Sequence, residues 1–132
     1  MSLMTPQESI ELLVAVQSLV VAVSHIVQPR AWVDFFVWLR SKGHAGVFAN
    51  GFLTLWFGTI IVAFHNVWSG LAMVVTLLGW AQVVKGTVAF VAPQLSMRGF
   101  MRVAPERAHE FVIAGVMFLG LSGVCWYLVL AG

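Results

Sequence analysis

The chain has 132 residues, of which 61% are hydrophobic and only 9% are charged. Soluble domains average roughly 45–50% apolar and about 25% charged residues, so this composition excludes a soluble domain. It also excludes a disordered chain, which requires low hydrophobicity and high charge. The net charge of +2 does not favour nucleic acid as a partner, because nucleic-acid binding requires a clustered basic face. We therefore expect a single integral membrane domain over residues 1–132.

Four stretches are long and apolar enough to cross a bilayer as helices, which takes roughly 20 apolar residues. They are residues 10–27, 44–65, 71–92 and 111–130. Before the first, Thr5, Pro6 and Glu8 predict a helix start in which Thr5 caps the helix and Glu8 reaches back to it. The first residues lack the basic region of a signal peptide, so we expect the first span to be retained. The sequence predicts an all-α membrane protein, a bundle of four transmembrane helices.

The basic residues indicate how this bundle is oriented. All seven Lys and Arg residues fall on one side of the predicted spans or, for Lys85, inside the third span toward that side. The positive-inside rule assigns this side to the cytoplasm, which places both termini outside the bacterial inner membrane. The basic residues expected at the membrane surface are Arg30, Arg40, Lys42, Arg98, Arg102 and Arg107.

The two connectors on this basic side have the apolar periodicity of helices. Their apolar residues recur at positions i, i+3, i+4 and i+7. This pattern predicts amphipathic helices that lie in the membrane plane with Arg and Lys near anionic lipid, the alternative being irregular loops with scattered aromatic residues. The residues are Trp32, Phe35, Phe36 and Leu39 in the first connector and Met97, Phe100, Met101 and Ala104 in the second.

A shift of 64 residues superimposes the two halves of the chain. It brings Pro29 onto Pro93, Phe36 onto Phe100 and Gly51 onto Gly115. We therefore expect a two-fold pseudo-repeat along the membrane normal, in which each half is a span, an in-plane helix and a returning span.

Small and polar residues also form one stripe along each span. In lipid such stripes mark the faces through which helices pack together. The stripe is Glu11, Ala15, Ser18, Ala22 and His25 in the first span and His44, Gly51, Thr54, Gly58 and His65 in the second. In the third it is Val75, Gly79, Gln82, Gly86 and Ala89, and in the fourth Ala108, Gly115, Phe118, Ser122 and Val129.

Polar residues inside a span are functional candidates, because they are costly to place in lipid. Lys85 comes first, and it either snorkels to the surface or turns inward to bind an anion or a carboxylate. Ser18 and Gln82 lie near mid-membrane, where we expect them to hydrogen-bond to each other rather than to bind a polar ligand. Glu11 lies about one turn inside the outer edge and is expected to face water.

Three of the four histidines are expected at the cytoplasmic boundary, where water or headgroups satisfy them. They are His25, His44 and His109. Three histidines at one level can in principle bind a metal or a haem, but their spacing does not support such a site. The single Cys125 excludes a cysteine-based zinc site. We expect no metal and no cofactor.

The fourth histidine opens a distinctive turn near the outer boundary, His65-Asn66-Val67-Trp68. Asn66 and Ser69 are expected to bend the chain and cap the next helix. The turn does not need His65, whose side chain is therefore free to hydrogen-bond to the first or the fourth span.

This four-residue motif is also part of a pattern that resembles a group of known proteins. Together with Thr76, Gly79-Trp80, Lys85-Gly86 and Pro93 it resembles small bacterial four-span proteins of uncharacterised function, which show a His-Asn-x-Trp turn followed by Gly-Trp and Lys-Gly. The likeness covers about a quarter of the chain. It implies no activity; it implies only a shared unit of His65, Asn66, Trp68, Trp80 and Lys85.

No catalytic constellation is present, so we do not expect an enzyme. The sequence has no Ser/His/Asp pattern and no glycine loop for phosphate. Our first hypothesis is a non-enzymatic binding or accessory module, acting as a homo-oligomer or within a larger inner-membrane complex. The second is an oligomeric small transporter or channel lined by Lys85, Gln82 and His65. The third is a haem- or metal-linked redox role that uses His25 with His44 or His109.

Overall fold

The computed structural model describes residues 3–132, which are helical throughout apart from short connections. The long helices confirm the four predicted stretches, with ends within four residues of those expected. Each is long and apolar enough to cross a membrane. The elements are α1 (Pro6–Val27), α2 (Pro29–Ser41), α3 (His44–Phe64), α4 (Met73–Val91), α5 (Pro93–Met101), the 3-10 helix η1 (Pro105–Arg107) and α6 (His109–Ala131).

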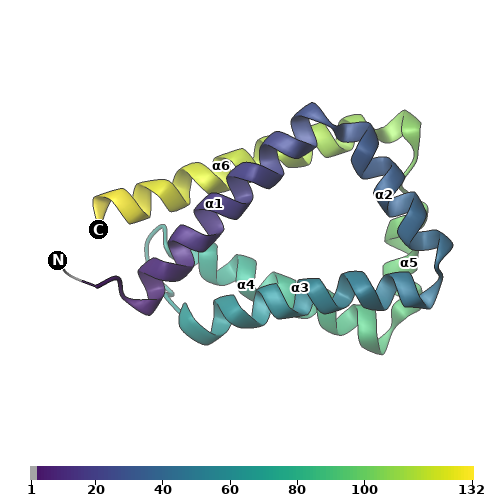
Figure 1. Ribbon diagram of the computed structural model, residues 1–132. Coiled ribbons are helices and arrows are strands. Elements are labelled where there is room, and N and C mark those ends of the chain that lie inside the picture. Colours follow the sequence, from purple (N-terminus) through teal and green to yellow (C-terminus); the bar gives the residue numbers. More distant parts are fainter. Residues whose placement is uncertain (1–2) are drawn as a thin grey trace.

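The long helices pack as two pairs, α1 with α6 and α3 with α4. In Figure 1 these pairs form two sides of a triangle, and α2 and α5 lie along the third. Both termini lie at the corner where the two pairs converge, away from α2 and α5. The structure therefore has a connector end and a terminal end.

The start of α1 forms as the sequence predicts. The Thr5 hydroxyl accepts a hydrogen bond from the Glu8 backbone N–H at 3.1 Å, and the Glu8 carboxylate accepts one from the Thr5 N–H at 3.0 Å. These two bonds satisfy donors that the first turn of a helix otherwise leaves free.

The helices α1 and α4 end in the same way. Gln28 after α1 has φ −126° and ψ 53°, and Ala92 after α4 has φ −137° and ψ 66°. A proline follows each of them and opens the next helix. Proline cannot continue a helix, but its fixed φ suits the first helical position. The backbone therefore changes direction in the same way before α2 and before α5.

The first connector confirms the predicted helix, and the second does so in part. The helix α2 contains the whole predicted apolar pattern, so the alternative prediction of an irregular loop is wrong for the first connector. The helix α5 ends at Met101, and Ala104 lies beyond it in an extended conformation with φ −154° and ψ 154°. Pro105 explains this, because the residue before a proline is sterically biased away from the helical region.

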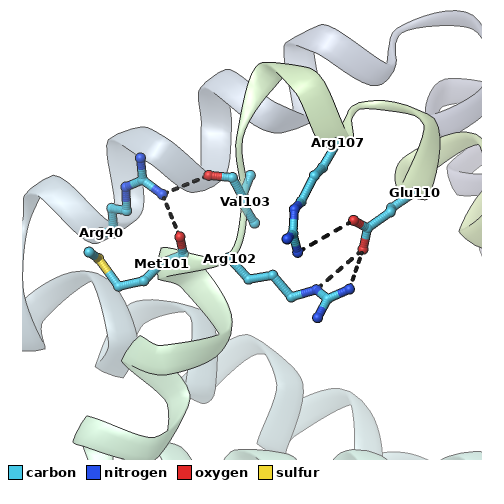
Figure 2. Close-up of polar contacts among 6 residues, drawn as sticks. All are labelled: Arg40, Met101, Arg102, Val103, Arg107 and Glu110. Carbon is cyan, nitrogen blue, oxygen red and sulfur yellow. Dashed lines mark hydrogen bonds and ion pairs between the residues drawn. The ribbon is translucent and has the colours of Figure 1, made fainter.

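Arg40 joins the two connector helices (Figure 2). Its Nη1 donates to the backbone carbonyls of Phe100 at 3.1 Å, Met101 at 3.5 Å and Val103 at 2.7 Å. The last carbonyls of a helix have no partner within the helix, so this guanidinium caps the end of α5. Arg40 is half-buried and fixes α5 to α2, whereas we expected a surface cation facing lipid.

The other cations expected at the surface are exposed. Arg102 and Arg107 both approach the Glu110 carboxylate, at 3.4 Å and 4.0 Å (Figure 2). Exposed ion pairs of this kind stabilise a fold by at most about 1 kcal/mol. The ammonium of Lys42 lies 5.6 Å from the centre of the Trp38 ring. The remaining two are Arg30 and Arg98.

Small residues allow close packing within each helix pair. A Cβ added at Gly58 of α3 would lie 2.7 Å from the Val83 backbone nitrogen, and one at Gly79 of α4 would lie 2.5 Å from Ile61 Cγ2. These positions therefore require glycine, as expected where helices associate in lipid.

The α1–α6 interface uses the predicted stripe of the first span, all of which is buried. From the other side, the Ser122 hydroxyl donates to the Ala15 carbonyl at 2.8 Å. A Cβ added at Gly115 of α6 would lie 2.9 Å from the Ala22 carbonyl oxygen. The packing function predicted for this stripe is thus confirmed.

Candidate functional site

Three polar side chains meet at the terminal end of the structure. They are Glu11 in α1, His65 just after α3 and Thr76 in α4, and their exposed fractions are 7%, 0% and 0%. His65 Nε2 lies 2.9 Å from Glu11 Oε2, and His65 Nδ1 lies 2.9 Å from Thr76 Oγ1. Both ring nitrogens of a fully buried histidine are therefore hydrogen-bonded.

The end of α3 places the imidazole in this position. His65 leaves the helical conformation, with φ −141° and ψ 98°, while its backbone N–H still bonds to the Ile61 carbonyl at 2.8 Å. Two residues later, the Val67 N–H donates to Thr76 Oγ1 at 3.0 Å. Thr76 thus holds both the imidazole and the connection that follows α3.

The hydrogen bonds assign a role to each group in this cluster. A carboxylate only accepts, so His65 Nε2 carries the hydrogen that bonds to Glu11. In neutral imidazole Nδ1 is then the acceptor, and the Thr76 hydroxyl donates to it. The hydrophobic core lies alongside: it contains Ile10 and Val75, the sequence neighbours of Glu11 and Thr76, together with Val14, Ile61 and Cys125.

The position of Glu11 contradicts one prediction, and the hydrogen bond of His65 confirms another. Glu11 was expected to face water, and this is wrong because its carboxylate is buried against His65. The expected bond from His65 to another span forms, and of the two spans proposed it is the first.

The turn after His65 differs from the prediction. The helix α4 begins after Ala72 with no side-chain cap, so neither Asn66 nor Ser69 caps it. Asn66 is exposed; its amide donates to the Val62 carbonyl, and its side-chain oxygen accepts from Trp80 Nε1 at 3.3 Å. Asn66 therefore satisfies a carbonyl in the last turn of α3 and joins this helix to α4, but it does not cap α4.

Lys85 lies elsewhere, at a cavity of about 510 Å³ near the connector end. The cavity is lined mainly by α3, α4 and α5, and neither aspartate nor glutamate is among its lining residues. Lys85 is exposed and forms none of the hydrogen bonds or ion pairs found within residues 3–132. Besides Lys85, the polar side chains of the lining are Asn50, Thr54 and Ser96.

The predicted hydrogen bond between Ser18 and Gln82 does not form. Ser18 is buried in α1, and its hydroxyl donates to the Val14 carbonyl of its own helix. Gln82 is half-buried in α4, which pairs with α3 rather than with α1. The two residues lie in different helix pairs, which explains why the bond is absent.

His25 lies in the last turn of α1, but the protein satisfies its ring rather than the expected water or headgroups. It is only 6% exposed, its Nδ1 lies 2.8 Å from the Val21 carbonyl oxygen, and its ring stacks on Trp32 at 4.2 Å. His44 and His109 are exposed as expected. Within residues 3–132 no three His, Cys, Asp or Glu side chains gather into a metal-binding group.

The predicted candidate residues thus divide between two places. His65 and Asn66 lie at the terminal end, and Lys85 lies about 14 Å along α4 from Thr76, toward the connector end. Sequence reasoning missed Glu11 and Thr76 as members of the buried cluster. A usable signal existed for Glu11, because it opens the stripe that marks the packed face of the first span.

The resemblance to small bacterial four-span proteins stays a prediction, because no family model, no curated protein and no solved structure matches the chain.

Proposed function

We propose that this protein is a four-span inner-membrane protein that acts as a non-enzymatic binding or accessory module, either as a homo-oligomer or within a larger membrane complex. The observation that carries the proposal is an exposed aromatic pair in the middle of α3. The rings of Phe52 and Trp56 lie 5.9 Å apart, and the two side chains are 54% and 55% exposed.

The position of Trp56 is unusual for a side chain that faces lipid. It lies about 18 Å along α3 from His44, near the middle of the span. Tryptophan favours the membrane interface, where the indole N–H finds water or headgroups. Within residues 3–132 no hydrogen bond involves Trp56 Nε1, whereas the indoles of Trp32 and Trp80 both have acceptors. A neighbouring subunit with a polar group at this depth would supply the missing acceptor.

We place both termini outside the cytoplasm. The basic residues of the two connectors support this orientation, and both termini lie at the end opposite to α2 and α5 (Figure 1). Reporter fusions test it: a fusion after Gly132 is expected to be active outside the cytoplasm, and one inserted at Gly43 inside. Cytoplasmic activity at Gly132 contradicts the orientation.

We also propose that the two halves form a pseudo-repeat. Gln28 and Ala92, which are 64 residues apart, have similar backbone angles. The helix pairs support the same relation, because the shift that takes α1 to α4 also takes α3 to α6.

Positions that are 64 residues apart also make similar contacts in the two helix pairs. Ser122 donates to the Ala15 carbonyl, and a Cβ at the equivalent Gly58 would lie 2.8 Å from the carbonyl oxygen of the equivalent Gly79. The rings of Phe36 and Phe100, which are equivalent to each other, lie 5.5 Å apart, as two residues beside a two-fold axis should.

The accessory role is favoured over a transport path. A path lined by Lys85, Gln82 and His65 requires the three side chains to face one continuous channel. His65 is fully buried and bonded through both ring nitrogens, and Gln82 does not line the cavity at Lys85.

Native gel electrophoresis of membranes solubilised in mild detergent tests the proposal. The wild-type protein is expected to migrate as an assembly larger than one chain, and Trp56→Phe is expected to shift it to a smaller species. Trp68→Phe is the matched control, because Trp68 is equally exposed, at 57%, but lies in the turn after α3. A wild-type monomer, or the same shift in both variants, contradicts an assembly through the Phe52–Trp56 face.

A further inference from the structure

We propose that the cavity at Lys85 is a binding site for one anionic phospholipid, whose headgroup pairs with the Lys85 ammonium. This inference depends on the proposed membrane placement but not on the assembly face at Trp56. The cavity has a volume of about 510 Å³, within the range of sites that bind small molecules.

The charge of the site favours an anion. The Lys85 ammonium has no acidic partner among residues 3–132 and lies in a helix long enough to cross the membrane. A cation in that position is costly unless an anion or water satisfies it. Arg40 does not line the cavity, but it holds two of the lining residues in place through the Phe100 and Val103 carbonyls.

The walls favour a lipid over a soluble anion. The aromatic rings of Phe36, Phe100 and Phe111 line the cavity, and most of the remaining lining is aliphatic. A soluble anion would lose its hydrating water on entering the cavity and gain only apolar contacts. A phospholipid has acyl chains that can contact the apolar walls while its charged headgroup pairs with Lys85. Asn50 and Ser96 also line the cavity, and their polar groups can hydrogen-bond to headgroup oxygens.

The location agrees with this occupant. The cavity borders α5, on the basic side of the protein. Basic pockets between transmembrane helices on the cytoplasmic side are known to bind phosphate headgroups of anionic lipids. The site therefore has the three features that such a lipid requires: an ammonium that is unpaired within residues 3–132, a largely apolar lining and a location on the basic side of the protein.

Native mass spectrometry of the purified protein, titrated with phosphatidylglycerol or phosphatidylcholine, tests the proposal. We expect one phosphatidylglycerol to bind in preference to phosphatidylcholine. Lys85→Met is expected to weaken phosphatidylglycerol binding about five-fold, the effect of one Lys charge beside an anionic lipid. Lys85→Arg should retain the binding. Lys42→Met is the charge control, since Lys42 is an exposed cation that does not line the cavity.

A second pair of variants tests the cavity independently of charge. Gly99 lines the cavity, and a Cβ there would have no atom within 4 Å, so Gly99→Leu adds a bulky side chain at the lining without a clash of its Cβ. It should also weaken phosphatidylglycerol binding. Gly123→Leu is its control, because Gly123 has similar open space on α6 and does not line the cavity.

Three outcomes would overturn the proposal. The first is equal affinity of the wild-type protein for both lipids. The second is a loss with Lys85→Met but none with Gly99→Leu, which would mean that Lys85 only snorkels to the surface. The third is complete displacement of the lipid by millimolar inorganic phosphate, which would identify a site for free anions. A negative result in the purified protein leaves the prediction for Trp56 standing, so the two proposals fail separately.

Discussion

The imidazole of His65 donates to the Glu11 carboxylate across 2.9 Å, in a place where the His65 side chain is fully shielded from solvent. Glu11 belongs to the α1–α6 pair, and His65 follows α3 of the α3–α4 pair. The bond therefore ties the two pairs together at the terminal end, while Arg40 and the connector helices do so at the other end. A polar bond between two apolar pairs has direct consequences for stability.

Removing the imidazole should destabilise the fold strongly. In His65→Ala the Glu11 carboxylate stays buried without its partner, and such a change lowers the free energy of unfolding by about 3 kcal/mol. Denaturant unfolding of the detergent-solubilised protein measures this loss. The control is His109→Ala, at an exposed histidine, which should change stability by no more than about 0.5 kcal/mol. Equal losses in both variants would contradict a structural role for the pair.

The Thr76 hydroxyl should donate to the ring nitrogen of His65 that carries no hydrogen. The Glu11 carboxylate accepts from Nε2 in the arrangement described above, so the neutral ring is expected to hold its hydrogen on Nε2 and to accept at Nδ1. Nitrogen-15 NMR of the labelled imidazole distinguishes the two ring nitrogens. Thr76→Ser should preserve the spectrum, and Thr76→Val, which removes the hydroxyl, should alter the Nδ1 signal. Identical spectra for both variants would mean that the Thr76 hydroxyl does not bond to Nδ1.

Glycine at the α3–α4 interface should be necessary for close packing. A Cβ at Gly58 would meet the Val83 backbone, which cannot move aside without separating the helices. We expect Gly58→Ala to lower the free energy of unfolding by about 2 kcal/mol, as overpacking does. Gly123→Ala is the matched control, because its Cβ meets open space, and it should be neutral or stabilising by up to about 1 kcal/mol. The prediction fails if both variants unfold alike.

Loss of the Arg40 guanidinium should loosen α5. In Arg40→Ala the carbonyls of Phe100 and Val103 lose their donor, so we expect faster amide hydrogen exchange over residues 97–104. Arg30→Ala is the control, since Arg30 is exposed and has no partner among residues 3–132. Unchanged exchange in Arg40→Ala would show that α5 is held by its apolar contacts alone.

Much of the fold could be predicted from local patterns. Thr5 and Glu8 have the spacing of a capping box, and the box forms because its bonds join residues only three positions apart. The periodicity of the first connector predicts α2 for the same reason, since it depends on residues of one helix. Other local predictions were wrong: Asn66 and Ser69 do not cap α4, and Ala104 lies outside α5 because Pro105 follows it.

The composition of the candidate site could not be predicted, because it depends on which helices become neighbours. Depth along the span gave a position for Ser18 and Gln82 but no information on their partners, and the predicted bond between them was wrong. For Glu11 the depth suggested water, whereas the partner comes from a residue 54 positions away.

The pairing of α1 with α6 also has a consequence for biosynthesis. The ribosome synthesises α1 well before α6, because α2 to α5 lie between them in the chain. Until α6 is made, the part of the α1 stripe that it covers, including the Ala15 carbonyl, has no neighbour. An arrested polypeptide that lacks α6 would therefore present this uncovered face to the proteases that remove incomplete proteins.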